Sequence, residues 1–327
     1  DTGEEVGRLP LKVNNLRGLA FHPDGDILAA SGNDKHIHLF RRQADGSFVA
    51  WKKLAGHSDS ILHLAFSADG KRLASASSDK SVLVFRLSNG EVIRRLSEHE
   101  AGVRAVAFSP DGQYLASCAK QKVYYWRLSD GARVSTMSGH KAQVNSVAFD
   151  ESGQFVFSGG EDMTLKVWGA ATGTLHNTTK RHNGPINSLH YHIPSKRLLS
   201  GYDDGMVRLW KLAPNLVVER SLLSRSSNIA DVAFSRDGRY VAAVHAIRDR
   251  TIKIWRTADL ALERTIPLRD GMHSLGFSPD GRFIAAGKYN QIKIWRLADG
   301  QLVRTLNGHK GLVMSVRYSP DGKYIAS

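Results

Sequence analysis

The chain contains a single cysteine, Cys118, among its 327 residues. One thiol cannot form an internal disulfide framework, and its scarcity is compatible with a reducing compartment. No apolar run approaches the roughly 18 residues that a transmembrane helix requires, and no run of ten or more residues shows a convincing helical period. We therefore expect an all-β, cytoplasmic protein without a membrane span.

The motifs of common catalytic and nucleotide-binding sites are also absent. The sequence has no G-x-x-x-x-G-K, no G-x-S-x-G and no H-E-x-x-H. His36 and His38, and His190 and His192, are two residues apart, but no Cys, Asp or Glu stands at ligand spacing to either pair to complete a tetrahedral metal site. We therefore expect no enzyme activity, no metal, no cofactor and no small-molecule substrate. Five of the 14 histidines instead recur nine residues before an aromatic residue: His57, His99, His140, His182 and His309.

What the chain does contain is one short motif in eight copies. An aromatic residue opens a turn of the form F-S-P-D-G, and successive aromatic residues lie 41 to 45 residues apart. A period of this size over the whole chain indicates one structural unit copied in tandem. The eight aromatic residues are Phe21, Phe66, Phe108, Phe149, Tyr191, Phe234, Phe277 and Tyr318.

Each copy contains four segments of strand length. In the third copy they are residues 103–108, 113–119, 121–128 and 132–140, rich in Val, Leu, Tyr and Trp and bounded by turn residues. Pro110, Asp111 and Gly112 favour a tight turn between the first two. A lone four-stranded sheet cannot bury both of its faces, whereas radially stacked sheets bury them against one another. The sequence predicts a single all-β domain, residues 1–327, that forms a β-propeller of four-stranded antiparallel blades.

The repeated pattern resembles the WD-repeat family over essentially the full length. Its elements are G-H, about nine residues, F-S-P-D-G, L-A-S and D-x-T-[IV]-K-[IVL]-W, and the best copies are residues 139–168 and 181–210. The near-identical A-F-S-P-D-G-x-x-L-A-S segments are similar to arrays in bacterial multidomain signalling proteins. The namesake Asp after Trp is missing, and its place is taken by Arg41, Arg86, Arg127, Gly169, Lys211, Arg256 and Arg296.

The two ends of the chain carry partial repeats. Residues 2–11 are similar to a fourth, outermost strand, and residues 313–327 to a first strand and most of a second. Seven complete sets of four strands lie between them. We favour eight repeat units, the eighth divided between the termini, with a seven-bladed ring as the alternative. We also expect the chain to be a slice of a longer repeat-containing protein.

The resemblance implies that a His, a Ser or Thr, an Asp and the Trp of one repeat form a buried hydrogen-bonded tetrad. Two repeats carry all four residues, and a third has Phe85 in place of Trp. Ser, His and Asp in contact can be mistaken for a hydrolase triad. Because groups buried between strands satisfy one another, we assign them a structural role. The tetrad residues are His140, Ser158, Asp162, Trp168, His182, Ser200, Asp204, Trp210, His57, Ser75 and Asp79.

The loops between second and third strands are the expected partner surface. The resemblance implies that peptides dock there, and the residues beside the tetrad Asp position or three before each aromatic residue differ from repeat to repeat. We expect a non-catalytic scaffold for protein or peptide partners, acting as the sensor or regulatory part of a larger signalling protein. The candidate contact residues are Asn33, His63, Ser78, Glu161, Asp203, Asp231, Arg248 and Lys288.

The charge supports an alternative function. The formal net charge is +14, and basic residues follow many third strands and D-G turns. A basic face would attract nucleic acid or an anionic surface. Lys and Arg at strand edges also keep repeated sheets soluble, and the D-G aspartates partly cancel the charge. The alternative to the protein scaffold is therefore a polyanion-binding module.

Overall fold

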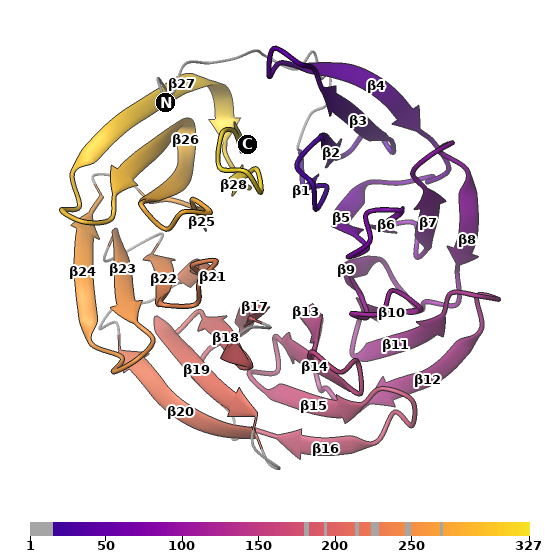
Figure 1. Ribbon diagram of the computed structural model, residues 1–327. Helices are drawn as coiled ribbons and strands as arrows, with labels where there is room; N and C mark the ends of the chain where they lie inside the picture. Colours follow the sequence, from indigo (N-terminus) through magenta and orange to yellow (C-terminus); the bar gives the residue numbers. More distant parts are fainter. Residues whose placement is uncertain are drawn as a thin grey trace. The chain divides into compact units, whose positions relative to one another are not determined.

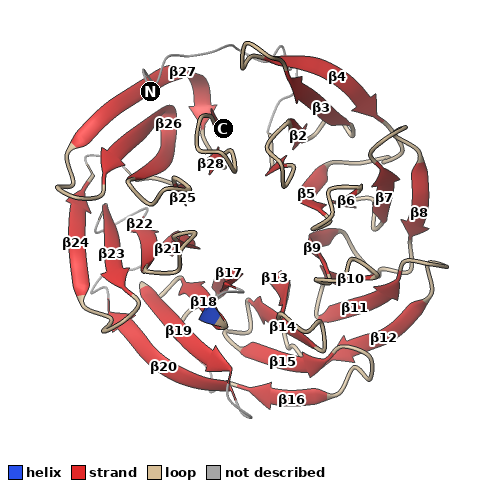
Figure 2. Ribbon diagram, viewed as in Figure 1, coloured by secondary structure: helices blue, strands red, loops and turns tan. Residues whose placement is uncertain are grey.

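The computed structural model describes residues 16–179, 183–192, 195–212, 216–223, 229–245, 250–268 and 271–327. The chain divides into two compact units, residues 1–158 with 166–176 and residues 159–165 with 177–327. Strands dominate the described residues of both units, and Figure 2 shows a short helical turn beside β18. No helix among the described residues has the length and apolar character needed to cross a membrane.

Every sheet with four strands has them in chain order, and Figure 1 shows this succession. The first three sheets are β1 (Gly18–Phe21), β2 (Ile27–Ser31), β3 (Ile37–Arg42) and β4 (Phe48–Leu54); β5 (Ile61–Phe66), β6 (Arg72–Ser77), β7 (Val82–Arg86) and β8 (Val92–Leu96); β9 (Val103–Phe108), β10 (Tyr114–Ala119), β11 (Lys122–Arg127) and β12 (Arg133–Ser138).

The next three sheets follow the same order. They are β13 (Val144–Phe149), β14 (Phe155–Gly160), β15 (Leu165–Gly169) and β16 (Leu175–Thr178); β17 (Ile186–His192), β18 (Arg197–Tyr202), β19 (Met206–Leu212) and β20 (Leu216–Leu223); β21 (Ile229–Phe234), β22 (Tyr240–His245), β23 (Thr251–Arg256) and β24 (Leu262–Pro267). The paired registers are antiparallel.

The seventh sheet contains β25 (Ser274–Phe277), β26 (Phe283–Arg296) and β27 (Leu302–Leu312). The second and third strands of this repeat form the single element β26, in which Asn290 has a φ of 66° and the register with β27 shifts beside it. Among the described residues, the last two strands, β28 (Arg317–Tyr318) and β29 (Ile325–Ala326), pair only with each other. The predicted four-stranded antiparallel blades are confirmed. Their number, seven, agrees with the seven-bladed alternative of the sequence analysis. The strand expected at residues 2–11 lies outside the described residues.

The core lies between neighbouring sheets. β6 and β7 are buried along almost their whole length, whereas β8 is only partly buried. Val82 and Val84 pack in one cluster with Val103, Leu115 and Trp126 of the next sheet. First strands also contact each other, β5 with β1 and β9, and β9 with β13. Each fully buried large apolar side chain contributes about 1.5–3 kcal/mol to this stacking.

The S-P-D-G motif forms a hydrogen-bonded turn between first and second strands. In the second repeat, where Ala68 replaces the Pro, Ser67 Oγ donates to Asp69 Oδ1 at 2.5 Å and accepts from Arg72 N at 3.0 Å. Gly70 has a φ of 68°, and a Cβ there would lie 2.1 Å from His22 Nε2. His22 Nε2 donates to the Gly70 carbonyl at 3.0 Å. The glycine is therefore required by both its backbone conformation and the close approach of the preceding blade.

Candidate partner-binding surface

Each blade has two edges with different chemistry. Because neighbouring strands are antiparallel, the turns from first to second and from third to fourth strand share one edge, which we call the S-P-D-G edge. The connections from second to third strand, and from the fourth strand to the next repeat, share the other, which we call the loop edge. At the S-P-D-G edge the same Ser–Asp hydrogen bond recurs at Ser67, Ser109, Ser235, Ser278 and Ser319.

Three predicted contact residues lie in the first two blades. Asn33 and His63 are exposed, and Ser78 is half-buried. Ser60 Oγ donates to Asn33 Oδ1 at 3.4 Å, and the Ser78 backbone N donates to the Ser60 carbonyl at 2.9 Å. The structure therefore joins Asn33 of the first blade and Ser78 of the second through one loop residue, Ser60.

The other predicted contact residues lie in the second unit. Glu161 is exposed, while Asp203 and Lys288 are half-buried. The Asp203 carboxylate accepts a hydrogen bond from Asn187 Nδ2 at 2.7 Å. Arg248 lies outside the described residues. The loop edge of this unit therefore presents side chains of both charge signs.

Asp231 differs from these residues because its carboxylate is held within the structure. Its side chain is 15% exposed. Asp231 Oδ2 accepts from Ser274 Oγ and from Leu275 N, both at 3.2 Å, and lies 3.7 Å from Arg317 Nη1. This carboxylate therefore links β21, β25 and β28, and the half-exposed Arg317 is the part of the cluster that solvent reaches.

The second blade contains a buried Asp–His–Ser chain. His57 Nδ1 donates to Asp79 Oδ2 at 2.8 Å, and His57 Nε2 accepts from Ser75 Oγ at 2.8 Å. Burial lowers the pKa of His57 despite its carboxylate partner. Burial alone would raise the pKa of Asp79, but hydrogen bonds from Ser81, Ser58 and His57 lower it to about 2. The pair is therefore a neutral imidazole and an ionised carboxylate, and Ser75 is fully buried.

In the fourth and fifth blades, the indole of a tryptophan donates a hydrogen bond to the buried serine. Trp168 Nε1 donates to Ser158 Oγ at 2.7 Å, and His140 Nε2 lies 2.7 Å from the same oxygen. Trp210 Nε1 likewise donates to Ser200 Oγ at 2.8 Å. Asp162 Oδ1 accepts from Thr164 Oγ1 at 2.8 Å, and Asp204 Oδ1 accepts from Met206 N at 2.9 Å. His182, predicted for the fifth blade, lies outside the described residues.

The third blade forms a similar chain that the sequence analysis did not assign. His99 Nε2 accepts from Ser117 Oγ at 2.7 Å, and Trp126 Nε1 donates to the same oxygen at 2.8 Å. Lys120 occupies the position of the expected Asp, and His99 Nδ1 donates instead to the Lys80 carbonyl at 3.1 Å. The sequence signal was the pair of His99 and Trp126 at their repeat positions.

Replacing His140 with alanine should lower the free energy of unfolding by about 1–3 kcal/mol, because Ser158 would lose a buried hydrogen-bond partner. Chemical denaturation measures this change. His309→Ala is the matched control, because His309 holds the equivalent repeat position but is exposed. A stability loss confined to His309→Ala, or an unchanged His140→Ala, would argue against a structural role for the buried chains.

Three arginines at the S-P-D-G edge are paired with aspartates. Arg127 donates to Asp130 at 2.6 Å, Arg256 to Asp259 at 2.7 Å and Arg296 to Asp299 at 2.9 Å. Each arginine replaces the namesake Asp of the repeat, and each partner belongs to the following turn. These hydrogen bonds lower the pKa of both Asp130 and Asp259 to about 2. The positive charge of these three arginines is therefore balanced by the neighbouring carboxylates.

Comparison with known proteins agrees with this geometry. The model of the WD domain, G-beta repeat, matches residues 131–169, 173–211, 218–256, 264–296 and 300–327, which together exceed half of the chain. The model of the anaphase-promoting complex subunit 4 WD40 domain matches residues 19–111. Protein hir1 of Schizosaccharomyces pombe is 29% identical over 109 residues, which cover 30% of this chain and 12% of that protein. The chain therefore spans only a small part of this relative's length. On these matches and its four-stranded repeats, the chain belongs to the WD-repeat family of β-propeller proteins.

Proposed function

We propose that the chain is a non-catalytic scaffold that binds protein or peptide partners at the loop edge of its blades. The observation that carries the proposal is the contrast between the two edges. The S-P-D-G edge repeats one hydrogen-bonding pattern, whereas equivalent loop-edge positions hold an amide at Asn33, a hydroxyl at Ser78, a carboxylate at Glu161 and an amine at Lys288. Varied side chains on a regular frame suit recognition, because loops on rigid scaffolds carry binding specificity.

The burial of the Ser–His chains supports a non-catalytic role. A nucleophilic serine must be accessible to substrate beside its base. Ser75, Ser117, Ser158 and Ser200 are all fully buried. Their hydroxyls are also engaged by histidine or indole groups within their own blades. These residues support the blades and leave the loop edge for contacts.

The regulatory context is a further part of the proposal. A rigid set of blades can hold several partners in fixed geometry, which suits the sensor part of a larger signalling protein. This part rests on the similarity of the repeats to bacterial signalling arrays.

A peptide-display library tests the scaffold proposal directly. We expect the chain to enrich peptides whose binding is lost at least tenfold in the double variant Glu161→Lys and Lys288→Glu, because both side chains reverse their charge at the loop edge. Arg239→Glu is the matched control, since Arg239 is an exposed residue of the S-P-D-G edge. The proposal fails if no peptide is enriched, or if the control abolishes binding and the loop-edge variant does not.

Polyanion binding is the second candidate, and the formal net charge of +14 favours it. The Arg–Asp pairs at the S-P-D-G edge weigh against a continuous basic face. A nucleic-acid complex would weaken steeply as salt rises, whereas a peptide complex of mixed charge would not.

A further inference from the structure

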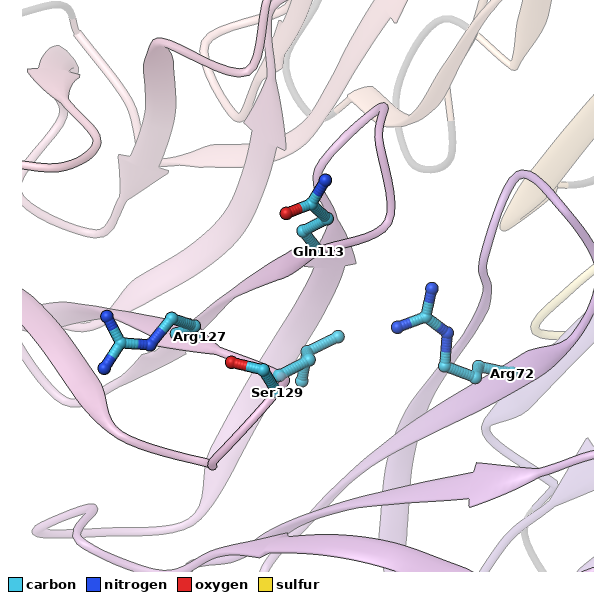
Figure 3. Close-up of a pocket in the computed structure, with 5 residues that line it drawn as sticks. Arg72, Gln113, Arg127 and Ser129 are labelled. Carbon is cyan, nitrogen blue, oxygen red and sulfur yellow. The ribbon is translucent and has the colours of Figure 1, made fainter.

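A pocket of about 200 Å³ lies at the S-P-D-G edge of the second and third blades. Its lining residues are Arg72 at the start of β6, Gln113 before β10, Arg127 at the end of β11, and Leu128 and Ser129 in the following turn. Figure 3 shows Arg72 and Arg127 on opposite sides of Ser129, with the Gln113 amide beside the space between them. Both blades belong to the first unit.

The pocket contains an arginine where most repeats have an aromatic ring. Five residues after the Ser, Asp or His that opens each turn, five repeats carry Tyr114, Phe155, Tyr240, Phe283 or Tyr324. In the third blade this ring is half-buried, and Tyr114 stacks on Tyr125 with centroids 4.9 Å apart. The second blade has Arg72 instead. The first repeat has Ile27 and the fifth has Arg197 at this position. In the second blade a charged group therefore takes the place of the ring that five repeats carry.

The Arg72 guanidinium is confined but poorly satisfied. Its side chain is 24% exposed, and its ion-pair partner, Asp69 Oδ2, is 3.8 Å away, beyond hydrogen-bond distance. It lies against the next turn, because a Cβ on Gly112 would be 3.0 Å from Arg72 Nη2. Within the part of the chain that the structure describes, the guanidinium donates no hydrogen bond. A guanidinium has five N–H donors in a fixed fork, which match a carboxylate.

The surroundings favour a single carboxylate over a polyanion. Arg127 is already held by Asp130, with Nε at 3.1 Å and Nη2 at 2.6 Å. Asp69 and Asp130 would repel a run of phosphates, while one negative charge can pair with Arg72. The pocket volume is also below the roughly 300–1,000 Å³ of small-molecule sites, so it fits a side chain better than a metabolite.

We propose that this pocket binds one Glu or Asp side chain of an acidic protein segment, with Arg72 as the main donor. Leu128 supplies apolar contact, and Gln113 and Ser129 supply neutral donors beside the carboxylate. The site lies at the edge opposite the loop edge, so it is a second docking point that does not depend on the loop-edge proposal.

The test uses the full chain and the capped peptide Gly-Gly-Glu-Gly-Gly, with Gln in place of Glu as the matched peptide. Nuclear magnetic resonance should show that the Glu peptide shifts signals of Gln113 and Ser129 and that the Gln peptide does not. Arg72→Tyr, which restores the ring found in other repeats, should weaken Glu-peptide binding about tenfold or more. Arg72→Lys should weaken it less, because a lysine retains the charge without the planar fork.

Two controls distinguish a specific effect of Arg72 from a general loss of charge or of folding. Arg239→Gln removes one positive charge from the same kind of edge and should leave binding unchanged, and thermal unfolding should show that each variant folds. Arg72→Gln replaces Arg72→Tyr if the ring prevents folding. Equal shifts with the Gln peptide, undiminished binding in a folded Arg72 variant, or a single-stranded oligonucleotide that shifts the same signals more strongly would overturn the proposal.

Discussion

Replacing Trp126 with alanine is expected to lower the free energy of unfolding by about 3–5 kcal/mol. Trp126 is 1% exposed and packs in a cluster with Val103, Val106 and Leu115. Its Nε1 also donates the 2.8 Å hydrogen bond to Ser117. The substitution leaves a large cavity between two blades and removes a buried donor. Equilibrium unfolding in urea, with a check that the transition keeps its slope, measures the loss.

Trp126→Phe separates the two contributions. Phe85 occupies the equivalent position of the second blade and is equally buried, so the blade frame accepts a phenyl ring there. We expect this variant to lower the free energy of unfolding by about 1 kcal/mol, the net value of one buried hydrogen bond, with a smaller additional loss from packing. If Trp126→Ala and Trp126→Phe lower the free energy of unfolding equally, the close packing described around Trp126 is contradicted.

Acidification from pH 6.5 to 4 should remove about 3 kcal/mol of stability through His99 alone. Burial lowers the pKa of His99 to about 4, with a smaller effect from the charge of Arg133. The folded protein therefore holds His99 neutral at pH values where the unfolded chain, with an ordinary pKa near 6.5, binds a proton. Because the unfolded state takes up this proton first, stability is complete above about pH 6.5 and falls until about pH 4.

The hydrogen-bond directions agree with a neutral His99. Its Nδ1 donates to the Lys80 carbonyl, so Nε2 must accept from Ser117, which itself accepts from Trp126. A protonated ring could not accept at Nε2. The third blade also has Lys120 where the second has Asp79, so no carboxylate compensates the charge.

His99→Gln tests this prediction, because glutamine does not titrate. Unfolding free energies measured at intervals between pH 7 and 3.5 should fall about 3 kcal/mol less across the window in the variant than in the parent chain. Protonation of Asp79, whose pKa is about 2, also lowers stability, but at lower pH. This loss should appear in both His99→Gln and the parent chain. An unchanged pH profile in His99→Gln would contradict the neutral, buried assignment.

The sequence predicted the blades because their determinants are local. The S-P-D-G turn is closed by its own Ser, Asp and Gly, as the bonds of Ser67 and Asp69 show. Strands bounded by such turns could be located to within a few residues, as in β9 and β11. That residues 1–327 act as a single domain stays a prediction.

The remaining features depend on contacts between repeats. Whether Asp231 is free or bonded to Ser274 cannot be deduced from one repeat, because its partner lies 43 residues away. The pocket at Arg72 likewise arises from the turn of the following blade. The chain through His99 was missed because the pattern required an Asp, whereas a backbone carbonyl accepts the same hydrogen bond.

Hydrogen–deuterium exchange with a library-selected peptide tests the scaffold claim most directly. The account predicts slower exchange on peptide binding in loop-edge segments such as residues 32–36, 78–81, 160–163 and 288–291, with no cleavage of the peptide. Protection confined to the S-P-D-G turns, or turnover of the peptide, would contradict it.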